Sequence, residues 1–306
     1  MRKDFLSIRD LSLYEFSQML DLAAEIKKRP QKCRQVLAGR ILAMIFQKPS
    51  LRTRMTFEAG MLQLGGEAIY LAPSDIQMGS RESAYDIGKN LERWVDGIMI
   101  RTFGHQIAVD LAQSTRIPVI NALTDLSHPC QGMADFFTLR EHKGGLAGLK
   151  LAYVGDGNNV CHSLLLAAAR AGTKMAVGTP AGYEPREEII RAAREDGRGT
   201  GFEVVLTHDP GEAVSGADAV YTDVWASMGQ EAMQAERRVV LETYRLDQAK
   251  LALANPGCLV LHCLPAHRGE EISADVLDGP NSVVWEQAEN RRHAQKALIS
   301  WLLEQT

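Results

Sequence analysis

The stretch Ile41-Leu-Ala-Met-Ile-Phe-Gln-Lys-Pro-Ser-Leu-Arg-Thr-Arg54 decides the fold class of this sequence of 306 residues. Its first six residues are all apolar, which is typical of a short strand that is buried on both faces. The polar residues 47–54 predict a loop, and residues 55–64 predict a helix that Gly65 and Gly66 close. A buried strand, a loop and a helix in this order predict one β-α unit of a parallel sheet.

The same alternation continues on both sides of this unit. Strands are predicted at residues 68–71, 97–101, 118–121, 150–154, 174–177, 219–222 and 258–262, and helices at residues 11–28, 83–94, 107–114 and 288–303. Repeated β-α units predict an α/β fold in which helices cover both faces of each parallel sheet.

A glycine-rich segment at residues 142–148 separates a helical pattern from a new strand, and it predicts a domain boundary. A chain of this length is also typical of two domains, at about 100–200 residues for each. We therefore expect a first domain at residues 1–141 and a second, of similar size, at residues 142–287. The amphipathic helix at residues 288–306 is expected to return to the first domain.

Composition narrows the class of protein. The net charge is −4, and no basic excess or basic tail points to a nucleic acid or an anionic membrane as partner. No apolar run approaches the ~20 residues of a membrane helix, and the N-terminal residues do not resemble a signal peptide. The 5 cysteines are an odd and scattered set, which is not a disulfide framework. These features predict an enzyme of the cytoplasm.

The polar segment after the first strand is a candidate anion site. Ser50, Arg52, Thr53 and Arg54 lie where a helix is expected to begin. The N-terminus of a helix offers N–H groups and a partial positive charge, and hydroxyl and guanidinium groups beside it favour a phosphate. The alternative is an ordinary capped helix with a solvated basic face.

Two further segments carry candidate ligand groups. His128 could donate to a carbonyl oxygen and Gln131 could hold an amide, while Pro129 presets the first turn of a helix. Asp223 ends a strand and could bind an ammonium group. In each case the alternative is a polar residue with a structural role only, as a satisfied histidine or as a helix cap.

Residues 155–160 (Gly-Asp-Gly-Asn-Asn-Val) weakly resemble a dinucleotide fingerprint. Val160 stands at the place of the third glycine, and no acidic residue follows the strand at residues 174–177 to hold a ribose. An NAD-dependent oxidoreductase is therefore the weaker alternative. A contact from Asn158 or Asn159 to a small polar ligand fits this loop better.

Cysteine and histidine residues are close together in the segment that contains Cys258, His262, Cys263 and His267. Their spacing differs from that of structural zinc sites, and neighbours in a strand point to opposite faces, so we expect no metal here. Cys263 could act as a nucleophile, but the spacing indicates no partner base.

Four segments together resemble the aspartate/ornithine carbamoyltransferase family. Residues 46–54 resemble its carbamoyl-phosphate loop, and residues 128–131 (His-Pro-Cys-Gln) resemble its second signature. Residues 223–229 (Asp-Val-Trp-Ala-Ser-Met-Gly) and 262–271 (His-Cys-Leu-Pro-Ala-His-Arg-Gly-Glu-Glu) resemble the ornithine branch. The four occur in order along nearly the whole chain, which is far more specific than any one of them.

The resemblance implies transfer of the carbamoyl group of carbamoyl phosphate to the δ-amine of L-ornithine, giving L-citrulline and phosphate, in arginine metabolism. It implies no cofactor and no metal, and a homotrimer or a multiple of trimers. It implies carbamoyl-phosphate contacts from Ser50, Leu51, Arg52, Thr53, Gln77, Arg101, His128, Pro129, Cys130, Gln131 and Arg291. It implies ornithine contacts from Asn159, Asp223, Ser227, Met228, Cys263 and Leu264, with Arg101, His128 and Cys263 as catalytic residues.

The sequence departs from the family pattern at three places. Leu51 stands where threonine is common, Gln47 where glutamate is frequent, and Cys130 at a variable position. The backbone N–H of Leu51 is retained, so the phosphate loop is expected to work. Two alternatives stay open: a different acceptor (aspartate, putrescine or acetylornithine), and a binding module without turnover.

Overall fold

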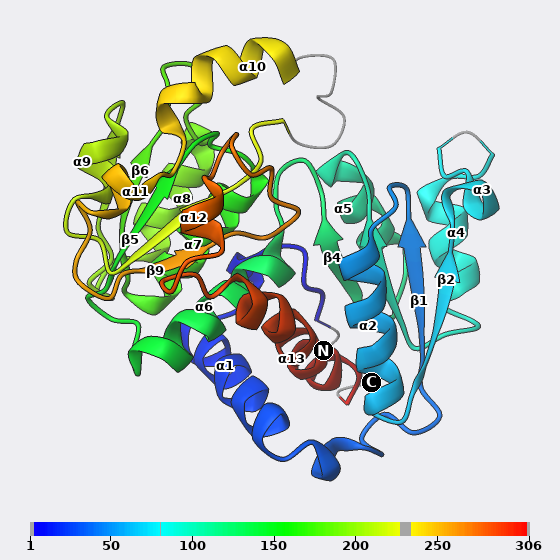
Figure 1. Cartoon of the computed structure of the whole chain (residues 1–306). Coiled ribbons are helices and arrows are strands. Elements are labelled where there is room, and N and C mark those ends of the chain that lie inside the picture. The colour runs from blue at the N-terminus through cyan, green and yellow to red at the C-terminus, as the bar shows by residue number, and fades with distance from the viewer. Residues whose placement is uncertain (1–2, 80, 227–233, 305–306) are drawn as a thin grey trace. The chain divides into compact units, whose positions relative to one another are not determined.

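The computed structural model describes residues 3–79, 81–226 and 234–304 (Figure 1). The chain divides into two compact units, Met1–Phe137 with Asn290–Thr306, and Thr138–Glu289. It passes from the first unit to the second within α6 (Pro129–Lys143), and it returns within α13 (Val284–Leu303). The predicted α/β fold with two parallel sheets is confirmed.

The first unit is built on a parallel sheet with the strand order β2-β1-β3-β4. The strands are β1 (Ile41–Phe46), β2 (Glu67–Leu71), β3 (Gly97–Arg101) and β4 (Val119–Leu123). The helices are α1 (Leu13–Lys28), α2 (Leu51–Gln63), α3 (Pro73–Ile76), α4 (Ala84–Leu91) and α5 (His105–Ser114), and 3-10 turns lie at Ile8–Asp10 and Pro30–Cys33.

The central strands of this sheet are apolar because both of their faces are covered. Five of the six residues of β1 are buried, and all five residues of β3. On one face, Ile45, Ile98 and Ile100 pack with residues of α4 and α5. The end of α13 belongs to this unit: Lys296 donates to Gln63 of α2 at 3.2 Å, and Lys27 of α1 donates to Asn290 at 2.8 Å.

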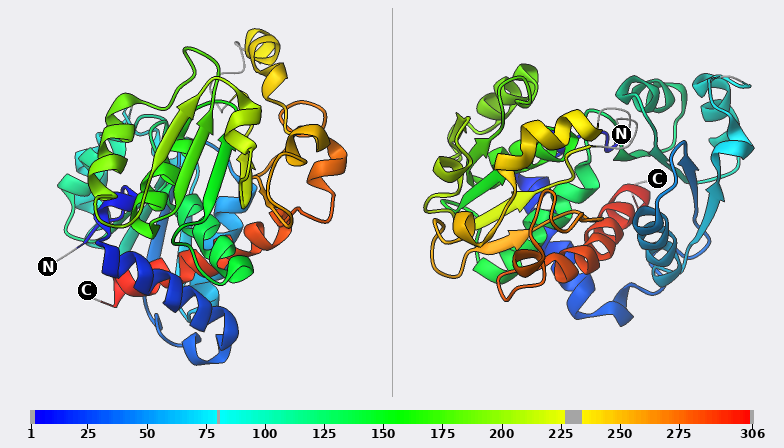
Figure 2. Two further views of the ribbon diagram at one scale, coloured as in Figure 1. Left: turned by 90° about the vertical axis from the view of Figure 1, so that its left-hand side faces the viewer. Right: turned by 45° about the horizontal axis from the view of Figure 1, so that its top comes forward.

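The second unit is also built on a parallel sheet, with the strand order β7-β6-β5-β8-β9. Figure 2 shows the ribbon from two further sides. The strands are β5 (Lys150–Val154), β6 (Lys174–Gly178), β7 (Val204–Thr207), β8 (Ala219–Thr222) and β9 (Leu259–Leu261). The helices are α7 (Asn159–Ala171), α8 (Glu187–Asp196), α9 (Pro210–Val214), α10 (Gln234–Leu241), α11 (Gln248–Leu251) and α12 (Ala274–Leu277), with a 3-10 turn at Glu242–Tyr244.

Each sheet has one place where the chain reverses the direction in which it adds strands. In the first unit it adds β2 on one side of β1 and then β3 on the other. In the second it adds β6 and β7 on one side of β5 and then β8 on the other. The loops at the carboxyl ends of two such strands diverge and leave a crevice, where open α/β sheets bind their ligands. These two crevices decide where functional groups are to be sought.

Several predicted elements differ from the structure in their bounds, and one strand was missed. The helix expected from residue 55 begins at Leu51, because Ser50 caps it. The strand expected to end at residue 262 ends at Leu261. The sequence analysis did not predict β7, an edge strand whose Val205 is 52% exposed, because partial burial leaves a weak apolar pattern. Within the described residues, we find no helix with the length and apolar character of a membrane span.

Candidate active site

In the first unit, the candidate anion site begins at the carboxyl end of β1. Ser50 has an extended backbone, and its Oγ accepts the N–H of Thr53 at 3.3 Å, which caps α2. Arg52 and Thr53 therefore lie in the first turn of the helix, not in a loop. The positive end of the helix dipole and its N–H groups face the end of the strand, as an anion site requires.

Arg101 lies beside this turn, at the end of β3. Its side chain is 6% exposed, and its Nη1 donates to Oγ1 of Thr53 at 3.4 Å. The pairing of β3 with β4 shifts register between Ile100 and Arg101, and such a shift re-aims the side chain that follows it. The fold thus places a buried guanidinium group at the first crevice.

A second guanidinium group comes from α13. Arg291 is 3% exposed, and its Nη1 donates to Oε1 of Gln131 at 2.6 Å. Burial lowers the pKa of His128 well below its ordinary value of 6.5, and the charges of Arg291 and Arg101 lower it further. His128 is therefore neutral at pH 7, and it offers a hydrogen bond and no added charge.

Three other predicted residues of this unit have side chains with other partners or surroundings. Leu51 is 75% exposed. The thiol of Cys130 donates to the carbonyl of Asn121 at 3.4 Å, and burial raises its pKa to about 12. Arg54, which was expected at the candidate anion site, lies over the ring of Tyr70, 3.9 Å from its centre. A ligand contact from Leu51 or Cys130 would thus come from the backbone.

Gln77 and Pro129 complete the predicted set in this unit. Gln77 follows α3 in a left-handed conformation, with a φ of 47°. It lines a cavity of about 200 Å³ together with Gln47 and Phe103. Pro129 is the first residue of α6, where its missing N–H has no helical partner to lose.

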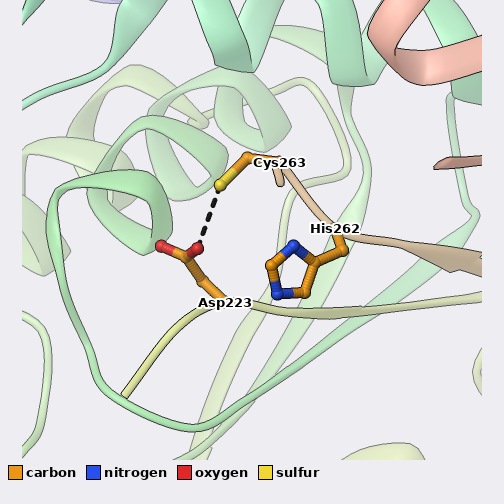
Figure 3. Close-up of side chains that lie close together, drawn as sticks. All are labelled: Asp223, His262 and Cys263. Atoms are coloured by element: carbon orange, nitrogen blue, oxygen red, sulfur yellow. Dashed lines mark hydrogen bonds between the residues drawn. The ribbon is translucent and has the colours of Figure 1, made fainter. Parts of the chain in front are cut away.

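In the second unit, Asp223 is the centre of a polar cluster at the crevice between β5 and β8. Its carboxylate is 4% exposed, and it accepts a hydrogen bond from Nδ2 of Asn158 at 2.7 Å. It also accepts one from the thiol of Cys263 at 2.9 Å, which Figure 3 shows as a dashed line. Asn158 also caps α7 through its Oδ1. Loops from β5, β8 and β9 thus bring one carboxylate, one amide and one thiol together.

His262 is held by the backbone and by a buried carboxylate. Its Nδ1 accepts the N–H of Leu264 at 2.9 Å, so its Nε2 must carry the proton that faces Oε1 of Glu271 at 3.1 Å. Leu264 has a left-handed backbone, with a φ of 59°.

The expectation that positions 262 and 263 point to opposite faces is wrong. β9 ends before them, and donor atoms of Asp223, His262 and Cys263 lie within 4.8 Å of one another. A metal ion at this cluster would have to displace hydrogen bonds that all three side chains already make. A second group of possible metal ligands consists of His267, Glu270 and Glu271. In this group, Oε1 of the buried Glu271 is already hydrogen-bonded to Nε2 of His262.

A buried ion pair borders the cluster around Asp223. Arg237 of α10 is 6% exposed, bonds to the carboxylate of Asp156 and donates through Nε to the carbonyl of Trp225 at 2.6 Å. Burial raises the pKa of Asp156 to about 6, Arg237 opposes that rise, and the charge of Asp223 adds to it. Burial also raises the pKa of Tyr153, whose hydroxyl donates to the carbonyl of Asp156 at 2.7 Å.

The loop that weakly resembles a dinucleotide fingerprint is closed by the protein itself. A Cβ atom at Gly157 would lie 2.3 Å from the backbone nitrogen of Pro185, and the N–H of Gly157 donates to Tyr183 at 2.8 Å. Glycine is needed here because another loop packs on it. A pyrophosphate that approached the same backbone would meet that loop.

Some predicted residues are not explained by this cluster, and some of its members were missed. Asn159 is the first residue of α7, and its neighbour Asn158 is the one bonded to Asp223. Ser227 and Met228 lie outside the described residues. Asp156 and Arg237 were not predicted as a pair, because they are far apart in the sequence. The position of Asp156, two residues after the end of a buried strand, was a usable signal.

Comparison with known proteins supports the family resemblance for both halves of the chain. Residues 3–141 match the family model "Aspartate/ornithine carbamoyltransferase, carbamoyl-P binding domain", and residues 147–302 match "Aspartate/ornithine carbamoyltransferase, Asp/Orn binding domain". The chain belongs to the aspartate/ornithine carbamoyltransferase family. The predicted family is therefore confirmed.

Similar proteins cover nearly the whole chain. The ornithine carbamoyltransferase of Carboxydothermus hydrogenoformans is 52% identical over 98% of this chain and 97% of its own length. The structure of ornithine carbamoyltransferase from Pyrococcus furiosus aligns with a TM-score of 0.94 and 47% identity over 97% of this chain and 96% of its own. The structure of the anabolic enzyme from Campylobacter jejuni aligns with a TM-score of 0.94 and 36% identity over 99% of this chain and 100% of its own.

Proposed function

We propose that this protein is an ornithine carbamoyltransferase, which converts carbamoyl phosphate and L-ornithine into L-citrulline and phosphate. Family members that are about half identical over almost the full length carry that name. The observation that carries the proposal is the chemical contrast between the two crevices. The first gathers guanidinium groups at a helix N-terminus, and the second gathers a carboxylate, an amide and a thiol.

We propose that the first unit binds carbamoyl phosphate. The cap residue Ser50 and the first turn of α2 offer the phosphate the backbone N–H groups of Leu51 and Arg52, the hydroxyl of Thr53 and the guanidinium group of Arg52. Arg101 and Arg291 neutralise its charge, and neutral His128 donates to the carbonyl oxygen. Gln77 is a further contact. Bidentate guanidinium contacts suit a phosphate dianion better than single charges do.

We propose that the second unit binds L-ornithine. Asp223 presents a buried carboxylate, which favours the positive α-ammonium group of an amino acid. Asn159, Ser227, Met228, Cys263 and Leu264 are the further contacts. Aspartate would require additional positive charge for its second carboxylate, which does not fit a cluster centred on Asp223.

The reaction joins the two substrates without a further reagent. The neutral δ-amine of ornithine adds to the carbonyl carbon, the nitrogen of the tetrahedral intermediate passes a proton to a phosphate oxygen, and the C–O bond to that phosphate breaks. Arg101, His128 and Thr53 stabilise the oxyanion, and removal of one such donor typically costs ~10²–10³ in rate. Phosphate is the leaving group, and Arg52, Arg101 and Arg291 stabilise its charge.

A citrulline assay across candidate acceptors tests the function. We expect citrulline from carbamoyl phosphate and L-ornithine, and little transfer to aspartate, putrescine or N-acetylornithine. Arg52→Ala should reduce citrulline formation strongly, because Arg52 lies in the first turn of α2. A wild-type rate for this variant would contradict the assignment of the phosphate site, and carbamoyl-phosphate binding without turnover would leave only a binding module.

We further propose that the protein forms a homotrimer or a multiple of trimers and works in the cytoplasm. Family resemblance supports the assembly, and five cysteines that are free thiols in the structure fit a reducing compartment. Measurement of the molecular mass in solution tests the assembly, since one chain has a mass of 33.7 kDa.

A further inference from the structure

We propose that Asp135 makes the carbamoyl-phosphate site select carbamoyl phosphate over an acyl phosphate. Asp135 does so by orienting the side-chain amide of Gln131 so that its oxygen, and not its NH₂ group, faces the substrate. This inference rests on the proposed function and names a specificity residue for it. Asp135 matches none of the motifs singled out in the sequence, and it lies one helical turn after Gln131 in α6.

The amide of Gln131 has two partners of opposite character. Its Nε2 donates to Oδ1 of Asp135 at 2.7 Å, and its Oε1 accepts from Nη1 of Arg291 at 2.6 Å. A guanidinium group can only donate, and an ionised carboxylate can only accept. The orientation of the amide is therefore dictated by its partners, and a flipped amide would place donor against donor and acceptor against acceptor.

Burial makes this orientation strict. Asp135 is 0% exposed, Gln131 1% and Arg291 3%, so water does not replace a lost partner at low cost. Gln131 and Asp135 are four residues apart on one helix, which brings their side chains together on the same face. The backbone thus supplies the fixed geometry, and the carboxylate supplies the direction.

As a consequence, the Gln131 side chain presents its oxygen, a hydrogen-bond acceptor, on the side of Arg291. A carbonyl oxygen has two lone pairs, and Arg291 uses one of those of Gln131. The second can accept an N–H from the substrate. The NH₂ of carbamoyl phosphate can donate there, whereas the methyl group of acetyl phosphate cannot. A site that leaves its polar group unpaired rejects the analogue without the hydrogen bond.

Two variants of similar size separate orientation from charge. Asp135→Leu removes the acceptor for the Gln131 amide, and it should raise the KM for carbamoyl phosphate about tenfold, as the loss of one oriented hydrogen bond predicts. The inhibition constant of acetyl phosphate, measured in competition with carbamoyl phosphate, should change less than about twofold, since it does not use that bond. Asp135→Asn can still present an oxygen to Gln131, and it should restore the KM.

A double variant guards against a folding defect in Asp135→Leu. In Gln131→Glu/Asp135→Asn, the carboxylate at position 131 can accept from the amide at position 135, from Arg291 and from the carbamoyl NH₂, so the preference over acetyl phosphate should persist. The matched control is Asp110→Asn in α5. Asp110 accepts a hydrogen bond from Nε2 of Gln106 at 2.8 Å, and this pair has the same spacing of four residues but is exposed. Asp110→Asn should change neither constant.

Each outcome is decisive. If Asp135→Leu weakens carbamoyl phosphate and acetyl phosphate equally, Asp135 has a general structural role and the proposal is wrong. If Asp135→Asn is as defective as Asp135→Leu, or if the folded double variant loses the preference, charge and not amide orientation is what matters, and the proposal is also wrong. Failure of the wild-type protein to form citrulline would instead contradict the proposed function.

Discussion

The two units share one architecture and carry opposite chemistry. Both place their candidate ligand groups at the crevice where a parallel sheet reverses its strand order. In the first unit, guanidinium charges help to lower the pKa of buried His128. In the second, the carboxylate of Asp223 helps to raise the pKa of Asp156 and Tyr153. The fold therefore fixes where a ligand binds, and a few side chains at the strand ends decide which ligand it is.

The largest expected effect comes from removing a cation of the first unit. Arg101→Ala should lower kcat by ~10²–10³, because one donor to the developing oxyanion is lost. Citrulline formation at saturating substrates measures this. Arg54→Ala is the matched control, since Arg54 lies over Tyr70 and not at the crevice. Equal losses in both variants would mean that overall positive charge, and not the position of Arg101, matters.

The corresponding change in the second unit should affect the other substrate. Asp223→Asn keeps the shape of the side chain and removes its charge. The KM for ornithine should rise by roughly 10-fold to 100-fold, as expected for the loss of a charge-assisted hydrogen bond of about 1.5–3 kcal/mol. The KM for carbamoyl phosphate should stay within about twofold. A rise in the KM for carbamoyl phosphate alone would contradict the assignment of the two units.

The raised pKa of Asp156 should make the folded protein less stable as pH rises. Its pKa is raised from 3.8 to about 6 in the folded protein, so between these values the folded protein holds more protons than the unfolded chain. The free energy of unfolding should then fall as pH rises through this window. Urea unfolding at pH 4–6.5 measures the free energy of unfolding of the wild-type protein and of Asp156→Asn. The difference between the two proteins in this free energy should shrink toward pH 4, where Asp156 is protonated.

In the first unit, the lowered pKa of His128 should have the opposite effect and make the folded protein less stable as pH falls. Its pKa is lowered well below 6.5, so just below that pH the unfolded chain takes up a proton that the folded protein does not. The free energy of unfolding should therefore fall as pH drops through 6.5, by at most about 1.4 kcal/mol per pH unit. His128→Asn should remove this part of the slope. An unchanged slope in the variant would show that His128 is not the group responsible.

The smallest expected effect is at Leu51, where the sequence departs from the family pattern. Its side chain is 75% exposed, and its predicted contribution is a backbone N–H. Leu51→Thr should change the KM for carbamoyl phosphate by less than about twofold, as for most exposed substitutions. A large improvement would mean that a hydroxyl group at this position contacts the phosphate.

Local sequence patterns predicted the elements that lie deep in each unit. Apolar runs such as residues 41–46 and 150–154 must be strands, because a parallel sheet buries both of their faces. The pattern failed at partly exposed elements such as β7. It also misplaced the start of α2, because the polar residues after Ser50 looked like a loop although they form the first helical turn.

The candidate site was predicted unevenly for a related reason. Asp223 was identified from its position at a strand end, whereas Arg101 was predicted only from the family resemblance. Partners that meet across large sequence distances were not, such as Asp156 with Arg237, since no local pattern links them. The orientation of the Gln131 amide likewise depends on Arg291, 160 positions further along the chain.

The sequence by itself determined the fold class and the family, because the order of buried strands and four short motifs are local features. Only the tertiary structure decided the protonation and direction of individual groups. His128 is neutral because of burial beside two arginines, and Asp135 and Arg291 together dictate the direction of the Gln131 amide. Burial and long-range contacts set these properties, since both change the energy of a charge or a hydrogen bond without changing the sequence around it.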